Sequence, residues 1–193
     1  MRKGIPALLL TLSLLLCGCR LLPERIPPAG LTVHFIDVGQ ADCALLESGG
    51  EYMLIDGGNR EDGRLVVSYL EQQGVEELAA VVCTHAHEDH VGGLPSVLAV
   101  YPTHAVYAPT RTYASRVFDD FVYYADQQRL EITIPSPGDG WTLGETSVTV
   151  LGPVQSYADQ NDTSIVLRID YGATSFLLTG DMESDAEREL VNS

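Results

Sequence analysis

The chain has 193 residues, which is long enough for one domain with a sizeable core and short for two. Hydrophobic residues make up 45% of it, which excludes a disordered or a fibrous protein. The formal net charge is −16. Such an acidic surface repels polyanions and argues against tight, non-specific binding of nucleic acid, but not against a nucleic-acid substrate held by metal ions and a few arginines.

The N-terminus has the pattern of a targeting segment, because two basic residues precede the apolar run 7–16. This run is too short to span a membrane comfortably. Its end, Leu-Cys-Gly before Cys19, resembles a bacterial lipoprotein signal. That resemblance implies a signal peptide at 1–18, a lipid on Cys19 and an extracytoplasmic, membrane-anchored protein. An ordinary secretory signal and an uncleaved anchor are the alternatives, and the proline-containing segment 19–30 reads as a tether.

We expect the folded domain to occupy residues 31–193 and to begin with three strands. Apolar segments at 31–38, 41–47 and 51–55 are separated by short turn sequences, which predicts a β-meander. Asp56 follows the third strand on a Gly-rich turn. A carboxylate in that position can be aimed into a pocket, although taken alone it is more often a turn residue.

A cluster of polar side chains follows the next predicted strand, at 78–83. It consists of His85, His87, Asp89 and His90, so three of the five histidines fall within six residues. Alternate residues of an extended segment point the same way, so His85 and His87 can converge on one ion. Imidazole and carboxylate are ligands of borderline divalent metals, so the cluster predicts a metal site rather than a solvated polar turn.

Apolar periodicity predicts the other elements. The strand at 174–178 leads to Asp181, a second carboxylate that a buried strand delivers at its end. The strands between 132 and 151 are expected in a second sheet. The predicted helices are 60–73, 92–100, 113–129 and 182–191, and the predicted strands are 104–108, 132–134, 141–143, 147–151, 164–170 and 174–178.

The H-x-H-x-D-H spacing from His85 to His90 resembles the main metal-binding motif of the metallo-β-lactamase superfamily. The resemblance implies an α/β protein built as an αββα four-layer sandwich and a hydrolase with up to two divalent ions, zinc or manganese. It implies that His85 and His87 bind the first ion and that Asp89 and His90 bind the second. It also implies that Asp181 bridges the ions and that Asp56 lies beside them, so that Asp89 and Asp56 are the candidate catalytic carboxylates.

Two segments look like the corresponding domain of ComEC, the DNA-uptake channel of natural transformation. They are Phe-Ile-Asp-Val-Gly-Gln-Ala-Asp at 35–42 and Leu-Ile-Asp-Gly-Gly at 54–58, with Ala41 where that family usually has glycine. The resemblance implies that a few further residues line the site. The alternative is that they only stabilise turns of the chain. These residues are Asp37, Gln40 and Asp42 at the rim, and Asn161 and Asp162 in place of the superfamily's usual third histidine.

We therefore expect a metal-dependent hydrolase that acts on phosphodiesters, with DNA as one candidate substrate. Hydrolysis of a small lactam or lactone is an alternative, and so is an inactive protein that holds DNA or a partner at the cell surface. Cys43 and Cys83 are expected to be small buried hydrophobes, with a disulfide between them as the other reading.

The resemblance also implies a longer fold than this chain supplies. Related proteins continue past the helix predicted at 182–191 into a further strand and a histidine-containing turn. The chain ends at Ser193 without either feature. We therefore expect a fragment whose fold is incomplete at the C-terminus and whose second metal is bound more weakly than the first.

Overall fold

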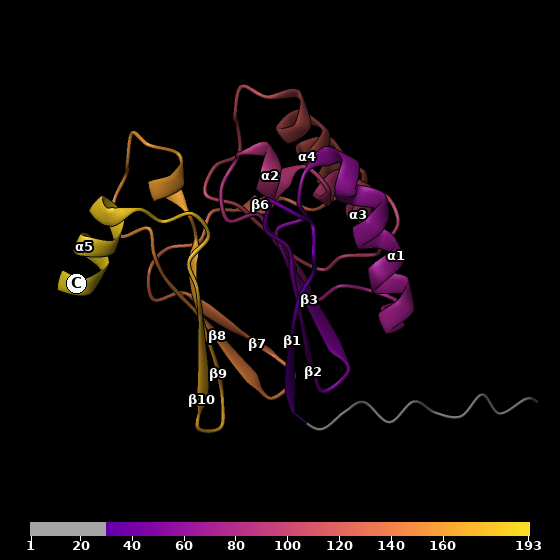
Figure 1. Cartoon of the computed structure of the whole chain (residues 1–193), viewed down its shortest axis with the longest axis horizontal. Coiled ribbons are helices and arrows are strands. Elements are labelled where there is room, and N and C mark those ends of the chain that lie inside the picture. Colours follow the sequence, from indigo (N-terminus) through magenta and orange to yellow (C-terminus); the bar gives the residue numbers. More distant parts are fainter. Residues whose placement is uncertain (1–29) are drawn as a thin grey trace, which may run out of the picture.

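The computed structural model describes residues 30–193, so the predicted signal peptide, Cys19 and nearly all of the tether lie outside it. Two β-sheets pack face to face, with helices on both outer surfaces (Figure 1). Across residues 30–193 no helix is both long and apolar enough to cross a membrane.

The first sheet has six strands in the order of the chain. The first three are antiparallel, as the meander pattern predicts, and the last three continue in parallel. The turn between the second and third strands uses Gly49 and Gly50, whose φ angles of 61° and 84° favour glycine. The strands are β1 (Leu31–Phe35), β2 (Ala44–Ser48), β3 (Glu51–Ile55), β4 (Ala80–Val82), β5 (Val106–Tyr107) and β6 (Ile132–Thr133).

Strand β6 corrects the sequence-based prediction, which placed the strand at 132–134 in the second sheet. It pairs in parallel with β5, at the edge of the first sheet. Helix α4 (Arg116–Gln127) lies between β5 and β6 and packs on the outer face of this sheet. The connection is therefore a crossover, which returns the chain to the same sheet in the same direction. A strand of two residues has no periodicity that would reveal its partner.

Helices cover the outer face of the first sheet (Figure 1). Alternate strand residues, among them Leu45, Leu54 and Val81, point to this side and pack in one cluster with Phe118 and Phe121. The elements on this side are the 3₁₀-helix η2 (Arg60–Asp62), α1 (Gly63–Gln73), α2 (Glu88–Val91), α3 (Leu94–Leu98) and α4 (Arg116–Gln127).

The second sheet is antiparallel, in the order β10-β9-β8-β7. Its apolar face, including Leu167 and Ile169, packs against Leu46, Met53 and Val82 of the first sheet. Helix α5 covers its outer face, on the left of Figure 1, so the layers follow the expected αββα order. The elements are β7 (Gly140–Leu143), β8 (Thr146–Gly152), the 3₁₀-helix η3 (Asn161–Thr163), β9 (Val166–Tyr171), β10 (Thr174–Leu178) and α5 (Ser184–Asn192).

The two described cysteines are small buried side chains, and they form no disulfide. The Cys83 thiol donates a hydrogen bond to the carbonyl oxygen of His85 at 2.9 Å. Burial raises the pKa of both thiols, which keeps them protonated at neutral pH.

The contact between the two sheets should dominate the stability of the domain. Leu167 of β9 is 0% exposed in that contact, so Leu167→Ala should lower the free energy of unfolding by about 2–5 kcal/mol. Leu177, on the neighbouring strand, is 55% exposed, and Leu177→Ala should change it by only about 0.5 kcal/mol. Urea unfolding measures both, and equal effects would contradict this assignment of the core.

Candidate metal centre

The candidate site lies where strand ends from both sheets meet. Because β3 and β4 are parallel, their carboxyl ends point the same way. Asp56 follows β3, and Thr84 and His85 follow β4 with one residue between. Asp181 arrives from the second sheet, three residues after the end of β10. Packing of the two sheets therefore brings together residues that are far apart in sequence.

Asp56 joins the two loops of the first sheet. Its backbone has a φ of 57°, a left-handed conformation that aspartate tolerates better than most residues. Its carboxylate accepts hydrogen bonds from the backbone N–H of Thr84 at 2.8 Å and from the Thr84 hydroxyl at 2.7 Å. The same carboxylate lies 2.8 Å from Nδ1 of His90. Asp56 thereby fixes the orientation of the His90 ring, as a carboxylate behind a metal-binding histidine does.

Close backbone packing holds these loops together. The N–H of Gly57 donates to the carbonyl oxygen of His90 at 2.7 Å. A Cβ atom on Gly57 would lie only 2.7 Å from the backbone nitrogen of Leu94, so a larger residue would push α3 away. The glycine after Asp56 is therefore part of what places His90.

Three side chains converge as a set of metal ligands would. His85, His90 and Asp181 each offer one ligand atom, and these atoms lie within 4.8 Å of one another. Nε2 of His90 is 3.3 Å from Oδ1 of Asp181, and Nε2 of His85 is 3.1 Å from Nδ1 of His87. Imidazole nitrogens and a carboxylate at such spacing fit a divalent ion. His90 thus lies beside both His85 and Asp181.

The two buried histidines differ in charge. Burial, together with the neighbouring His90 and His87, lowers the pKa of His85 to about 3, so its ring is neutral and its lone pair is available. Burial also acts to lower the pKa of His90, but the hydrogen bond and charge of Asp56, with Asp181 and Asp89, raise it to about 9. In the metal-free protein His90 is therefore protonated at neutral pH, and an ion at its Nε2 must displace a proton.

The other residues predicted from sequence lie around this group. Asp89 is half-buried, and the side-chain amide of Gln40 donates to it at 3.4 Å. The exposed Asp37 accepts a hydrogen bond from the N–H of Gly39 at 3.2 Å, which is turn geometry. Neither Asp37 nor Gln40 supplies an atom to the converging ligand group.

Asn161 and Asp162 belong to η3, which packs against the start of α5. The amide of Asn161 donates to the Glu183 side chain at 3.0 Å. The buried carboxylate of Asp162 accepts from the N–H groups of Glu183 at 3.0 Å and Ala186 at 3.4 Å, so it stabilises the first turn of α5.

Two more residues belong to the site: Thr84, which the sequence analysis did not single out, and Asp42, which it expected at the rim. Thr84 bridges Asp56 and the histidines, and its hydroxyl lies 3.3 Å from Nδ1 of His85. Asp42 forms a second group with Asp56 and His90, again with one ligand atom from each within 4.8 Å. Thr84 could have been identified from the sequence, because it lies between a predicted buried strand and the first histidine of the motif.

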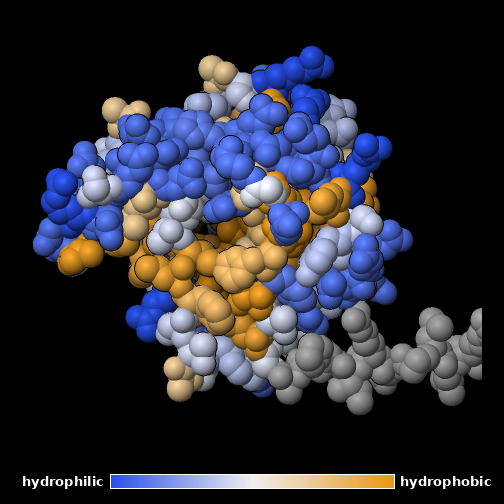
Figure 2. Space-filling view, viewed as in Figure 1, coloured by the Kyte–Doolittle hydropathy of each residue, from blue (hydrophilic) through white to orange (hydrophobic). Residues whose placement is uncertain are grey.

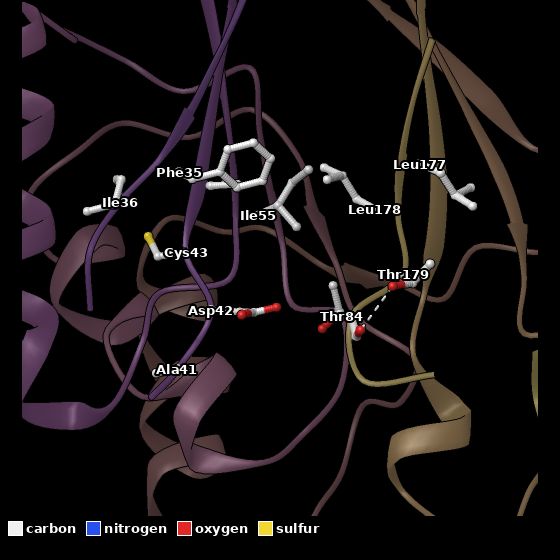
Figure 3. A pocket seen from close by; sticks show the side chains of 12 residues that line it. Phe35, Ile36, Ala41, Asp42, Cys43, Ile55, Thr84, Leu177, Leu178 and Thr179 are labelled. Atoms are coloured by element: carbon white, nitrogen blue, oxygen red, sulfur yellow. Dashed lines mark hydrogen bonds between the residues drawn. The ribbon is translucent and has the colours of Figure 1, made fainter. Parts of the chain in front are cut away.

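An open cleft leads to the site between the edges of the two sheets. Its cavity has a volume of about 280 Å³. Apolar side chains, including Phe35, Ile55 and Leu178, line one end, and Asp42 and Thr84 line the other (Figure 3). Figure 2 shows apolar side chains gathered around a hollow in this face of the molecule.

Comparisons with known proteins agree with this fold. The sequence profile of the metallo-β-lactamase superfamily matches residues 36–193, and the chain belongs to that superfamily. The solved metallo-β-lactamase SMB-1, with bound 2-mercaptoethanesulfonate, shares the fold with a TM-score of 0.52 at 16% identity, over 86% of this chain and 72% of that one. The expected superfamily and fold class are confirmed.

The curated relatives place the chain within the superfamily. It is 27% identical over 180 residues to ComE operon protein 3 of Bacillus subtilis, which covers 83% of this chain and 23% of that protein. It is 29% identical over 182 residues to Recombination protein 2 of Haemophilus influenzae, covering 91% and 21%. The chain is therefore a ComEC-like member, as the segment 35–42 predicts, and it spans less than a quarter of these relatives.

The charge on His90 gives a test of the contact with Asp56. In the metal-free protein the His90 ring should titrate near pH 9, followed by its NMR ring signals. Asp56→Asn removes the negative charge beside Nδ1 and should lower this pKa. The matched control Asp120→Asn, which removes an exposed carboxylate paired with Arg60 at 2.9 Å, should not. Unchanged titration in Asp56→Asn would show that this contact is absent in solution.

Proposed function

We propose that the protein is a metal-dependent hydrolase of phosphodiesters that binds up to two ions, zinc or manganese. The observation that carries the proposal is the convergence of His85, His90 and Asp181, with His87 beside His85. Thr84, which precedes His85, lines the cleft. Bound ions of this kind polarise the substrate and lower the pKa of water toward about 7.

We assign the site residues roles in binding the ions, in orienting the ligands and in accepting a proton. His85 and His87 would hold one ion, and Asp89 and His90 would hold the other. Asp181, whose ligand atom lies within 4.8 Å of those of His85 and His90, would lie between the two ions. Asp56 keeps the His90 ring oriented through Nδ1 and leaves Nε2 for the ion. Thr84 holds Asp56 in place through two hydrogen bonds. Asp89 would be the carboxylate that accepts the proton of the activated water.

The phosphodiester substrate rests on the resemblance to ComEC-like proteins and on the names of the relatives. An acidic chain with a net charge of −16 would hold DNA through bound ions rather than through a basic surface. Hydrolysis of a small lactam or lactone is the second candidate, and the apolar walls of the cleft favour it. The third is an inactive protein that binds DNA or a partner at the cell surface.

A substrate panel tests the proposal. The purified protein, with Mn²⁺ or Zn²⁺ added back after chelation, is given a chromogenic phosphodiester, single-stranded DNA, a chromogenic β-lactam and a lactone. We expect metal-dependent hydrolysis of the phosphodiesters. Asp181→Ala should reduce kcat/KM by more than the about 10–100-fold typical of residues that only orient a ligand. The control Asp185→Ala, an exposed position on α5, should retain activity.

The panel also separates the alternatives. Turnover of the lactam or lactone without phosphodiester cleavage would replace the proposed substrate class. No turnover by a protein that still binds metal, together with a DNA or protein partner recovered on it, would support the binding role.

We also propose that the mature protein is held at the extracytoplasmic side of the cell membrane by a lipid on Cys19. The support is the order of basic residues, apolar run and Leu-Cys-Gly-Cys in the sequence. Mass spectrometry of the mature N-terminus should find a lipidated Cys19, and the protein should fractionate with membranes. Cys19→Ser should release it to the soluble fraction, and an unmodified Cys19 or cleavage elsewhere would refute the anchor.

A further inference from the structure

The loop between β5 and α4 is a basic part of an otherwise acidic chain. Residues 90–118 contain no aspartate or glutamate, although the formal net charge of the chain is −16. Arg111 lies on this loop, Arg116 is the first residue of α4, and both are exposed. Within residues 30–193 neither of them forms an ion pair. The two guanidinium groups are therefore available to an anion.

This loop lies next to the candidate metal centre. Helix α2, which follows His87 directly, contacts α4, and the two helices lie side by side at the top of Figure 1. The ring of Tyr113, on the loop, has its centre 6.4 Å from the centre of the His87 ring, with an angle of 68° between the planes. Nδ1 of His87 is 3.1 Å from Nε2 of His85. Tyr113 therefore stands beside the histidine pair that would hold the first ion.

Contacts on both sides of Tyr113 fix the conformation of the loop. Nε of Arg111 donates to the carbonyl oxygen of Ile132 at 2.9 Å, which leaves the other N–H groups of this guanidinium for a ligand. The Tyr113 ring packs edge-on against Phe118, with the ring centres 6.1 Å apart. The Ser115 hydroxyl accepts from the N–H of Phe118 at 3.3 Å and caps α4. A loop held in this way loses little conformational entropy when it binds a ligand.

Open hollows lie on both sides of the loop. One has a volume of about 650 Å³ and is lined by Arg111 and Tyr113, with Asp119 as its one acidic residue. The other has a volume of about 410 Å³ and is lined by Arg116 together with Arg60. An aromatic ring between guanidinium groups suits a single nucleic-acid strand, because an unpaired base stacks on the ring and phosphates pair with the cations.

We propose that Tyr113, Arg111 and Arg116 form a subsite that holds a single strand of nucleic acid beside the metal centre. The Tyr113 ring stacks on an unpaired base, and the two arginines contact phosphates of the strand. In a duplex the bases stack on one another, so no free base face is presented to Tyr113. That the bound strand is the substrate rests on the proposed function, whereas binding by these three residues does not.

Fluorescence anisotropy with a short oligothymidylate tests the stacking contact. The linkages are phosphorothioates, so the strand is not consumed when Mn²⁺ is present. Tyr113→Leu keeps an apolar side chain against Phe118 but removes the ring, and should raise the Kd by about 5- to 100-fold. Tyr113→Phe keeps the ring and should bind like the parent protein. The control Tyr123→Leu replaces a tyrosine of α4 that is 55% exposed and should leave the Kd unchanged.

The salt dependence of the same binding tests the arginines. Each phosphate contact that is lost should reduce the slope of log Kd against log salt concentration by about 0.7. We expect this reduction in Arg111→Gln and in Arg116→Gln. The control Arg129→Gln removes an equal charge from an exposed position beyond the other end of α4 and should leave the slope unchanged.

Three results would overturn the subsite. They are a Kd that is the same in Tyr113→Leu and the parent protein, an equal loss of slope in Arg129→Gln, and equally tight binding of the oligonucleotide annealed to its complement. If one of these occurs while the protein hydrolyses a chromogenic phosphodiester, the subsite is wrong and the proposed function stands. If no phosphodiester is hydrolysed but binding depends on Tyr113 and the two arginines, the subsite is supported and the proposed hydrolysis is wrong.

Discussion

The buried carboxylate of Asp56 is the interaction on which the site depends. It is 2% exposed, and its oxygen atoms are satisfied because Thr84 supplies two hydrogen bonds and His90 a third contact at 2.8 Å. One side chain thus joins the end of β3, the end of β4 and the helix α2. Removing any partner would leave a buried charge unsatisfied, which costs far more than the lost bond itself. The left-handed backbone conformation of Asp56 is locally strained, and the contacts of its side chain hold it in place.

The sandwich as a whole is what completes the centre. The first sheet places Asp56 and the histidines at one end, but Asp181 belongs to the second sheet and reaches His90 only because the two apolar faces pack together. Hydrophobic burial between the sheets is non-directional. Successive side chains of a strand point to opposite faces, however, and this alternation determines which of them are buried between the sheets. Stability of the inter-sheet core and geometry of the site are therefore coupled, since a shift of one sheet against the other would move Asp181 away from His90.

Local sequence patterns anticipate those elements that have a clear period or a clear stop. The meander β1–β3 follows from alternation and glycine turns, and α1 and α4 follow from their apolar stripes, with Gly74 ending α1 in a left-handed conformation. Sequence patterns do not predict the position of an element that is too short to show a periodicity. Strand β6 has two residues, and its pairing with β5 depends on where α4 returns the chain.

The sequence by itself determined the chemistry of the centre and its superfamily. The spacing of His85, His87, Asp89 and His90 brings imidazole and carboxylate together within one turn of chain, and no folding is needed to keep them close. The resemblance also implied that Asp56 and Asp181 lie near the histidines, but only the tertiary structure decided which ligand atoms meet. His90 lies with His85 and Asp181 in one group and with Asp42 and Asp56 in another, although Asp42 is 48 positions before it. Spacing controls direction only along one segment, whereas these contacts cross loops and sheets, and packing alone sets their distances.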